Sequence, residues 1–121
     1  MAPPRRHLRR QADREFDRKL AQLCRQVEHH LSLVLAEFDD EVLSSLTLVG
    51  VHSSPDGSRL LLSVLPDSVE GQAPSEALIL ARLAEARGRL REEVAAAIHR
   101  RRTPSLDFRV AKDWELDESP P

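Results

Sequence analysis

The chain has 121 residues, the size of one ordinary domain, and its 40% hydrophobic and 31% charged residues are typical of a globular protein with one core. No apolar run approaches the ~20 residues that a membrane-spanning helix needs, and no apolar segment follows the basic N-terminus as it would in a secretory signal. The single cysteine, Cys24, excludes an internal disulfide and a CxxC metal site, so we expect a reducing cytoplasm.

The net charge of −2 hides a strong segregation of charge along the chain. Residues 1–26 carry a net charge of +5 and residues 82–112 another +5, whereas residues 27–81 carry −8 and residues 113–121 carry −4. Two basic segments that meet in the fold would form a surface for a polyanion. The alternative is a generally arginine-rich surface, because 16 of the 18 basic residues are arginine.

The first elements in chain order are a basic arm and a long helix. Residues 1–12 contain prolines and arginines without apolar periodicity, which predicts a disordered arm. From about Asp13 to Glu37, apolar residues recur every three or four positions, which predicts one amphipathic helix. The apolar positions of this helix are Phe16, Leu20, Leu23, Val27, Leu31, Val34 and Phe38.

A β-hairpin is predicted next. Residues 46–52 alternate around a β-branched run, with Leu46, Leu48, Gly50 and His52 on one face. Residues 53–58 contain a Pro-Asp-Gly turn, and residues 59–65 form the return strand. Before the hairpin, Asp39-Asp40-Glu41 ends the helical pattern and predicts a solvated connection.

Residues 76–101 are predicted to form a second helix, which Ser75 caps at its N-terminus. Gly88 predicts a break or kink near residues 86–88, and Pro104 ends the helix. Residues 105–110 alternate with period two and predict a third strand, followed by an acidic and frayed tail over residues 112–121. The expected inner face of the helix consists of Leu80, Leu83, Leu90, Val94 and Ile98.

The order helix, strand, strand, kinked helix, strand predicts a small α+β domain over residues 13–111, with a three-stranded sheet and helices on one face. Such a layer has no room for a large enclosed pocket. The residues that we expect to be buried are Leu20, Leu23, Val27, Leu31, Leu83, Leu90, Val94, Ile98 and Phe108.

The sequence offers no credible catalytic or metal site. The adjacent His29 and His30 would point about 100° apart on a helix, and with Cys24 and Glu28 they lack the ligand spacing of a zinc site. No nucleophile elbow and no phosphate-binding glycine loop is present. We therefore expect no enzyme activity, no metal and no cofactor.

An R-x-x-P-x-L-x-F pattern runs from Arg101 to Phe108, and residues 86–88 read Ala-Arg-Gly. These segments resemble the ribosome-binding factor A family, whose fold is similar to a type II KH domain. Residues 88–108 resemble its C-terminal half, and Arg101, Pro104, Leu106 and Phe108 match its R-x-x-P-x-L-x-F approach to the last strand. Residues 86–88, Ala-Arg-Gly, resemble its Ala-x-Gly kink between two helices, and residues 23–32 resemble its first helix. The resemblance covers roughly residues 16–110. The family's Asp-Pro-Arg before the first strand and its Asp-x-Ser after the last strand are absent.

The resemblance implies a non-enzymatic assembly factor that binds the small (30S) ribosomal subunit, contacts 16S rRNA and assists late maturation and rRNA processing. It also implies ribosomal proteins as further partners, and we expect a monomer without membrane contact. Structured RNA of this kind is recognised through shape, phosphates and 2′-hydroxyls. The alternative is a protein-interaction domain that adds its hairpin edge to a partner's sheet.

If the two helices pack side by side, their basic residues would form one stripe for rRNA phosphates. Arg100, Arg101 and Arg102 are expected to end the second helix, where cations also complement the helix dipole. Gly88 would expose a helix start that favours a phosphate, or it would only let two helices pack closely. The predicted RNA-binding residues are Arg18, Lys19, Arg25, Arg87, Gly88, Arg89, Arg91, Arg100, Arg101 and Arg102.

Overall fold

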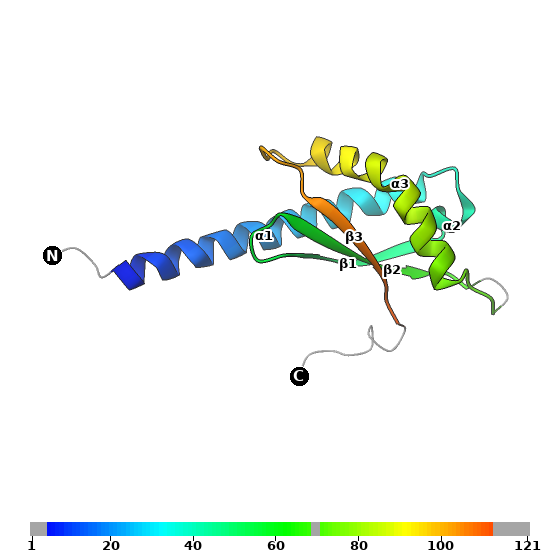
Figure 1. Cartoon of the computed structure of the whole chain (residues 1–121), viewed down its shortest axis with the longest axis horizontal. Coiled ribbons are helices and arrows are strands. Elements are labelled where there is room, and N and C mark those ends of the chain that lie inside the picture. Colours follow the sequence, from blue (N-terminus) through cyan, green and yellow to red (C-terminus); the bar gives the residue numbers. More distant parts are fainter. Residues whose placement is uncertain (1–4, 69–70, 113–121) are drawn as a thin grey trace.

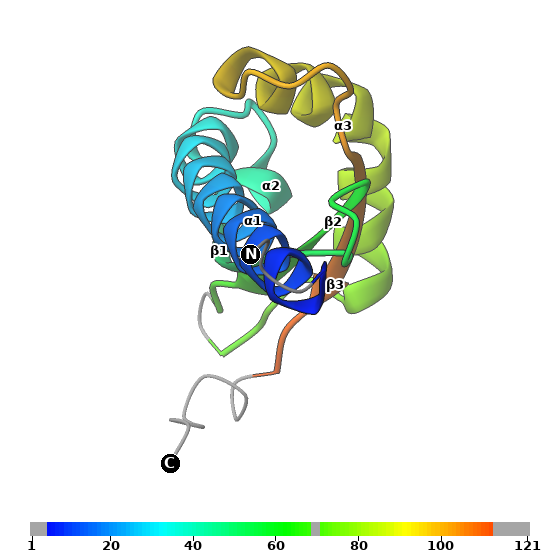
Figure 2. The same cartoon turned by 90° about the vertical axis from the view of Figure 1, so that its left-hand side faces the viewer.

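A computed structural model of the chain describes residues 5–68 and 71–112. The elements are α1 (Arg5–Ala36), α2 (Glu41–Ser44), β1 (Leu46–Ser53), β2 (Arg59–Pro66), α3 (Glu76–Ala97) and β3 (Ser105–Val110). The strands form one sheet in the order β1-β2-β3, in which β1 and β2 pair antiparallel and β2 and β3 pair parallel. α1 packs against β1 and α3, and α3 also packs against β3 (Figures 1 and 2). The predicted α+β layer with a three-stranded sheet is confirmed.

α1 is longer than the sequence pattern predicts. It begins at Arg5 rather than near Asp13, so the helix includes residues 5–12, which the sequence pattern assigns to the basic arm. The apolar periodicity starts only at Phe16, and residues 11–15 before it are all exposed, so the pattern could not show the earlier turns. Figure 1 shows the N-terminal part of α1 projecting beyond the sheet.

The connection after α1 contains a short helix that the sequence pattern does not reveal. α2 spans only four residues, and Asp40 is its N-cap. The Asp40 carboxylate accepts hydrogen bonds from the backbone N–H groups of Val42 at 2.9 Å and Leu43 at 3.1 Å. The segment Asp39-Asp40-Glu41, predicted to be a solvated connection, thus contains a residue that caps a helix. Leu43 of that helix is buried in the core.

A β-bulge in β1 changes the predicted alternation of the first strand. The pairing register with β2 shifts between Leu48 and Gly50. Leu46 and Leu48 are buried before the shift, and Val51 is buried after it. His52 was predicted to share a face with Leu46, but it is exposed. The extra residue of a bulge reverses the inward and outward positions that follow it.

α3 is one continuous helix that bends (Figures 1 and 2). Its green first half and its yellow second half run in different directions, so the predicted kink is present but the predicted break is not. The helix ends at Ala97, and its C-cap is Ile98, whose backbone N–H donates a hydrogen bond to the carbonyl oxygen of Val94. The prediction that Arg100–Arg102 end the helix is therefore wrong, because these residues lie in the loop between α3 and β3.

The core lies between the helices and one face of the sheet. Of the nine residues predicted to be buried, eight are buried, while Phe108 is only half-buried and packs at the edge of the core. In the first turn of α3, Ile79 is fully buried, and Leu80, predicted to face inward, is half-buried. Phe16 continues the apolar stripe of α1 but is 40% exposed, because it lies near the end of the packed part of the helix.

None of the helices in the described part of the chain is long and apolar enough to cross a membrane. The acidic tail predicted over residues 112–121 lies outside the described residues, except for Lys112.

Candidate nucleic-acid interface

All ten residues predicted to bind RNA are exposed, but the fold does not gather them into one stripe. It brings one group together around the loop between α3 and β3. It distributes the others over α1 and over two different sides of α3.

Four of the predicted arginines line a single surface depression of about 700 Å³. Arg91 comes from α3, and Arg100, Arg101 and Arg102 come from the following loop. The opposite wall is the β1–β2 turn, residues 56–58, and Asp56 is the one acidic residue of the lining. We call the surface made by these four arginines the loop arginine surface.

Two of these arginines hold the surrounding backbone in place. The guanidinium of Arg91 donates hydrogen bonds to the carbonyl oxygens of Thr103 at 3.0 Å and Pro104 at 3.4 Å. The guanidinium of Arg100 donates to the carbonyl of Gly57 at 3.2 Å. Arg91 thus ties the loop to α3, and Arg100 ties it to the hairpin turn. Both side chains remain exposed and keep further N–H donors, since a guanidinium carries five.

Lys19 extends the loop arginine surface onto α1. It lines a second depression, of about 330 Å³, together with Arg100 and His99 from the loop after α3. Arg100 therefore lines both depressions and connects the one that contains Lys19 with the one that contains Arg101 and Arg102. This contact between the first helix and the loop after α3 is the part of the predicted stripe that the fold does assemble.

Arg87 and Arg89 leave α3 in different directions. The Arg87 guanidinium lies 5.4 Å from the ring centroid of Phe108 on β3. The Arg89 guanidinium lies 4.4 Å from the ring centroid of Phe38, which follows α1. Arg87 is one helical turn before Arg91 and so continues the loop arginine surface. Arg89 contacts the opposite side of the helix, so the sequence prediction that grouped it with Arg91 and Arg101 is wrong.

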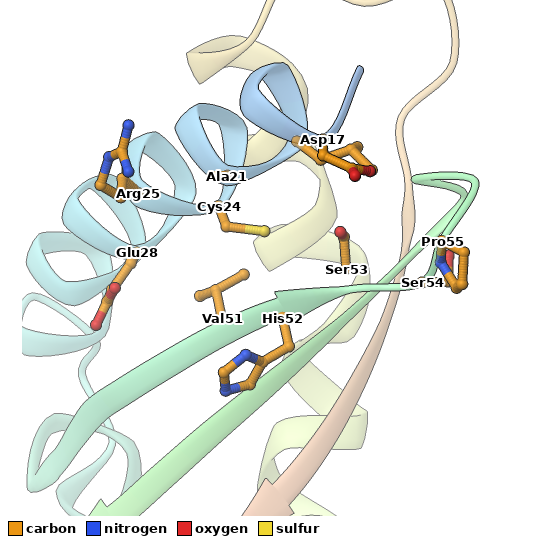
Figure 3. Close-up of a pocket in the computed structure, with 11 residues that line it drawn as sticks. Asp17, Ala21, Cys24, Arg25, Glu28, Val51, His52, Ser53, Ser54 and Pro55 are labelled. Atoms are coloured by element: carbon orange, nitrogen blue, oxygen red, sulfur yellow. The ribbon is translucent and has the colours of Figure 1, made fainter. Parts of the chain in front are cut away.

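Arg25 lies at another pocket, between α1 and β1 (Figure 3). Its neighbours there include Asp17 and Glu28, so the charge of this pocket is mixed. The Cys24 thiol points toward Ser53 in Figure 3, and burial raises its pKa more than the hydrogen bonds with Ser53 lower it. A thiol with a raised pKa is a poor nucleophile. This pocket therefore offers neither an anion site nor a reactive cysteine.

Gly88 provides neither of the functions that the sequence suggested for it. α3 continues through it, so no second helix N-terminus is exposed there. A Cβ atom at this position would have no neighbour within 4 Å, so Gly88 is not needed for close helix packing either. The glycine that does matter near the basic surface is Gly57, which has a φ of +75° in the hairpin turn.

The hairpin turn is a part of this surface that the sequence prediction missed. The backbone N–H of Ser105, at the start of β3, donates to the carbonyl of Ser58 at 3.0 Å. Together with the bond between Arg100 and Gly57, this contact seats the turn against the loop between α3 and β3. The Pro-Asp-Gly sequence predicts the turn, but no sequence signal shows what the turn packs against.

The described residues contain no group of three or more potential ligands that could hold a metal ion. Of the histidines considered as ligands, His30 instead contacts Glu93, with 2.9 Å between its Nε2 and the carboxylate Oε2. This contact joins α1 to α3, so the role of this histidine in the fold is structural.

The solved structures that resemble this chain include two of ribosome-binding factor A. One is the crystal structure of ribosome-binding factor A from Thermus thermophilus, which is 30% identical, has a TM-score of 0.64, and aligns over 74% of this chain and 92% of its own. The other is a homology model of the Thermus thermophilus factor, fitted into a cryo-EM map of its complex with the 30S subunit. It is 32% identical, with a TM-score of 0.53, over 74% of this chain and 87% of its own. No family model and no curated protein matches the sequence.

The comparison and the fold agree with the motifs that suggested the family. The R-x-x-P-x-L-x-F residues lead into β3, which contains Leu106 and Phe108 and covers the predicted range of residues 105–110. The helix at the Ala-Arg-Gly segment bends rather than breaks. From the identity over nine-tenths of the Thermus chain and the shared KH-like fold, it follows that this protein belongs to the ribosome-binding factor A family.

Proposed function

We propose that this protein is a non-enzymatic assembly factor that binds the small (30S) ribosomal subunit through its loop arginine surface and contacts 16S rRNA there. The observation that carries the proposal is the convergence of Arg91, Arg100, Arg101 and Arg102 on one depression. The relative fitted into the map of a 30S complex supports the choice of partner. Family membership also favours a role in late maturation and rRNA processing. We expect the protein to perform this role in the cytoplasm as a monomer.

The four arginines have two different roles in binding. Arg91 and Arg100 use donors on backbone carbonyls and thereby fix the shape of the loop. No hydrogen bond or ion pair within the described part of the chain engages Arg101 or Arg102, and both are exposed. Arg101 and Arg102 are therefore the side chains that contact phosphate groups, because a guanidinium pairs with phosphate through two parallel hydrogen bonds.

Arg87 adds a stacked guanidinium at the edge of the same surface. Its position over Phe108 restricts its motion, so less side-chain entropy is lost when it pairs with an anion. Structured RNA is recognised mainly through its shape, phosphates and 2′-hydroxyls, which suits a basic surface without a deep pocket.

The test compares two double variants with the same change in charge. Arg101→Gln/Arg102→Gln removes the two unengaged arginines, whereas Arg25→Gln/Arg89→Gln removes two predicted arginines that the fold places elsewhere. Cosedimentation with purified 30S subunits at several salt concentrations gives the affinity and its salt dependence. We expect the first variant to lose on the order of tenfold or more in affinity. The slope of log affinity against log salt concentration should become less steep by about 1.5, because each lost phosphate contact removes roughly 0.7–0.9 from its magnitude.

The control variant should bind nearly as wild type does. An equal loss in both variants would show that only the total charge matters and would refute the assignment to the loop arginine surface. Binding that is independent of salt in the wild-type protein would refute RNA contact and favour the alternative, a protein-interaction domain that uses its hairpin edge. Circular dichroism confirms that both variants are folded.

A further inference from the structure

We propose that the projecting N-terminal part of α1, residues 5–18, is a second RNA-contacting element whose arginines follow a phosphate backbone beyond the body of the domain. This inference rests on the proposed function, because it takes the RNA of the small subunit as the target. It assigns binding to a segment outside the loop arginine surface.

The first argument is the geometry of the helix. α1 begins at Arg5, and its first buried residue is Leu20. Residues 11–19 are all exposed, and the first side chain that lines a depression on the body is Phe16. At 1.5 Å per residue, the eleven residues 5–15 extend the helix by about 16 Å. Figures 1 and 2 show this part of α1 extending past the end of the sheet.

The second argument is the spacing of the arginines. Positions 6, 10, 14 and 18 are all arginine, and positions four apart lie on one side of a helix. Arg14 and Arg18 are exposed, and neither forms an ion pair with another described residue. Asp13, Glu15 and Asp17 lie in the same segment, and its six arginines leave residues 5–18 with a net charge of +3. Along a continuous helix, the ends of this row, positions 6 and 18, are about 18 Å apart.

The third argument concerns the occupant. A helix that docks on a protein groove presents apolar anchors at three- and four-residue spacing. Within residues 5–15, the apolar residues are Leu8 and Ala12, which is too little apolar area for a protein interface. Arginines pair bidentately with phosphate, and a line of them complements the repeating charge of an RNA backbone. The charge complementarity therefore favours RNA over an acidic protein.

The experiment uses the full chain and two double variants with equal changes in charge. Arg14→Gln/Arg18→Gln interrupts the row. Arg5→Gln/Arg9→Gln is the matched control, because positions 5 and 9 share a side of the helix with Asp13 and Asp17. Binding is measured to purified 30S subunits, to an RNA duplex of about 16 base pairs and to polyglutamate, each across a range of salt concentrations, with circular dichroism as the folding control.

We expect the row variant to bind both 30S subunits and the duplex on the order of tenfold more weakly, with a salt slope lower by about 1.5. The control should lose less than threefold. Equal losses in the two variants, an unchanged affinity of the row variant, or a loss confined to polyglutamate would each overturn the inference. If the row variant binds as wild type while Arg101→Gln/Arg102→Gln still loses binding, the inference fails and the proposed function stands. If neither variant loses binding, the proposed function fails as well.

Discussion

Replacing Gly57 with alanine tests how the hairpin turn is joined to the rest of the fold. Gly57 has a φ of +75°, and a Cβ atom there would lie 2.7 Å from Cδ2 of Leu20 and 3.2 Å from the guanidinium of Arg100. The left-handed backbone costs alanine about 1–2 kcal/mol. The close contact with buried Leu20 adds about 1–2 kcal/mol, at the lower end of overpacking because a leucine methyl can rotate. We therefore expect Gly57→Ala to lower the free energy of unfolding by about 2–4 kcal/mol.

Gly88→Ala is the matched control for this substitution. Gly88 lies within α3, its φ is not positive, and an added Cβ would meet no neighbour within 4 Å. Because alanine is favoured over glycine in a helix interior, we expect Gly88→Ala to raise the free energy of unfolding by about 0.5–1 kcal/mol.

Both free energies come from urea denaturation followed by circular dichroism, and the Tm should change by about 4 °C per kcal/mol for a domain of this size. A Gly57→Ala variant as stable as wild type would refute the packing of the turn against α1 and the loop after α3. A destabilised Gly88→Ala variant would show that the bend of α3 depends on glycine.

Two further predictions concern the core and the turn. Leu31 of α1 is fully buried in the core, so Leu31→Ala should lower the free energy of unfolding by about 2–5 kcal/mol. A loss below about half a kcal/mol in urea denaturation would contradict the assignment of the inner face of α1. Hydrogen bonds from the backbone of Ser58 and from the hydroxyls of Ser58 and Ser54 lower the pKa of Asp56 from 3.8 to about 2. Because this folded-state pKa is below the unfolded one, its contribution to stability is complete above about pH 4 and is lost as the pH falls to about 2. Thermal unfolding of wild type and Asp56→Ala should therefore differ at about pH 5 and converge near pH 2, and a constant difference across this range would refute the role of the carboxylate.

The elements with strong local signals were predictable from the sequence. β3 has the predicted bounds, because a period of two over residues 105–110 is a clear signal between Pro104 and the polar tail. The hairpin was also predictable, since Pro-Asp-Gly favours its turn whatever surrounds it. The start of α3 follows from Ser75, whose hydroxyl accepts a hydrogen bond from the backbone N–H of Leu78 at 3.2 Å.

The errors lie where local signals are weak or where one residue changes the register. The first turns of α1 carry no regular apolar pattern, and residues 11–15, which follow them, are all exposed. The end of α3 at Ala97 depends on where the chain must turn to reach β3, and the arginines that follow are good helix formers that local propensity would continue. The bulge at Val49 reverses the facing of the last residues of β1, and a periodicity count cannot anticipate an inserted residue.

In the candidate site, too, some features follow from the sequence and others only from the fold. The sequence by itself determined that basic residues are concentrated in two segments, and the motif around Arg101 and Pro104 indicated the family. Only the tertiary structure decided which arginines meet, because side chains separated by two positions on α3, such as Arg89 and Arg91, point to different sides of the helix. The seating of Gly57 beneath Arg100 joins residues 43 positions apart, and no local pattern encodes a contact of that range. Charge and periodicity are properties of neighbours along the chain, whereas a binding surface depends on distances between elements, which the packing of the core fixes.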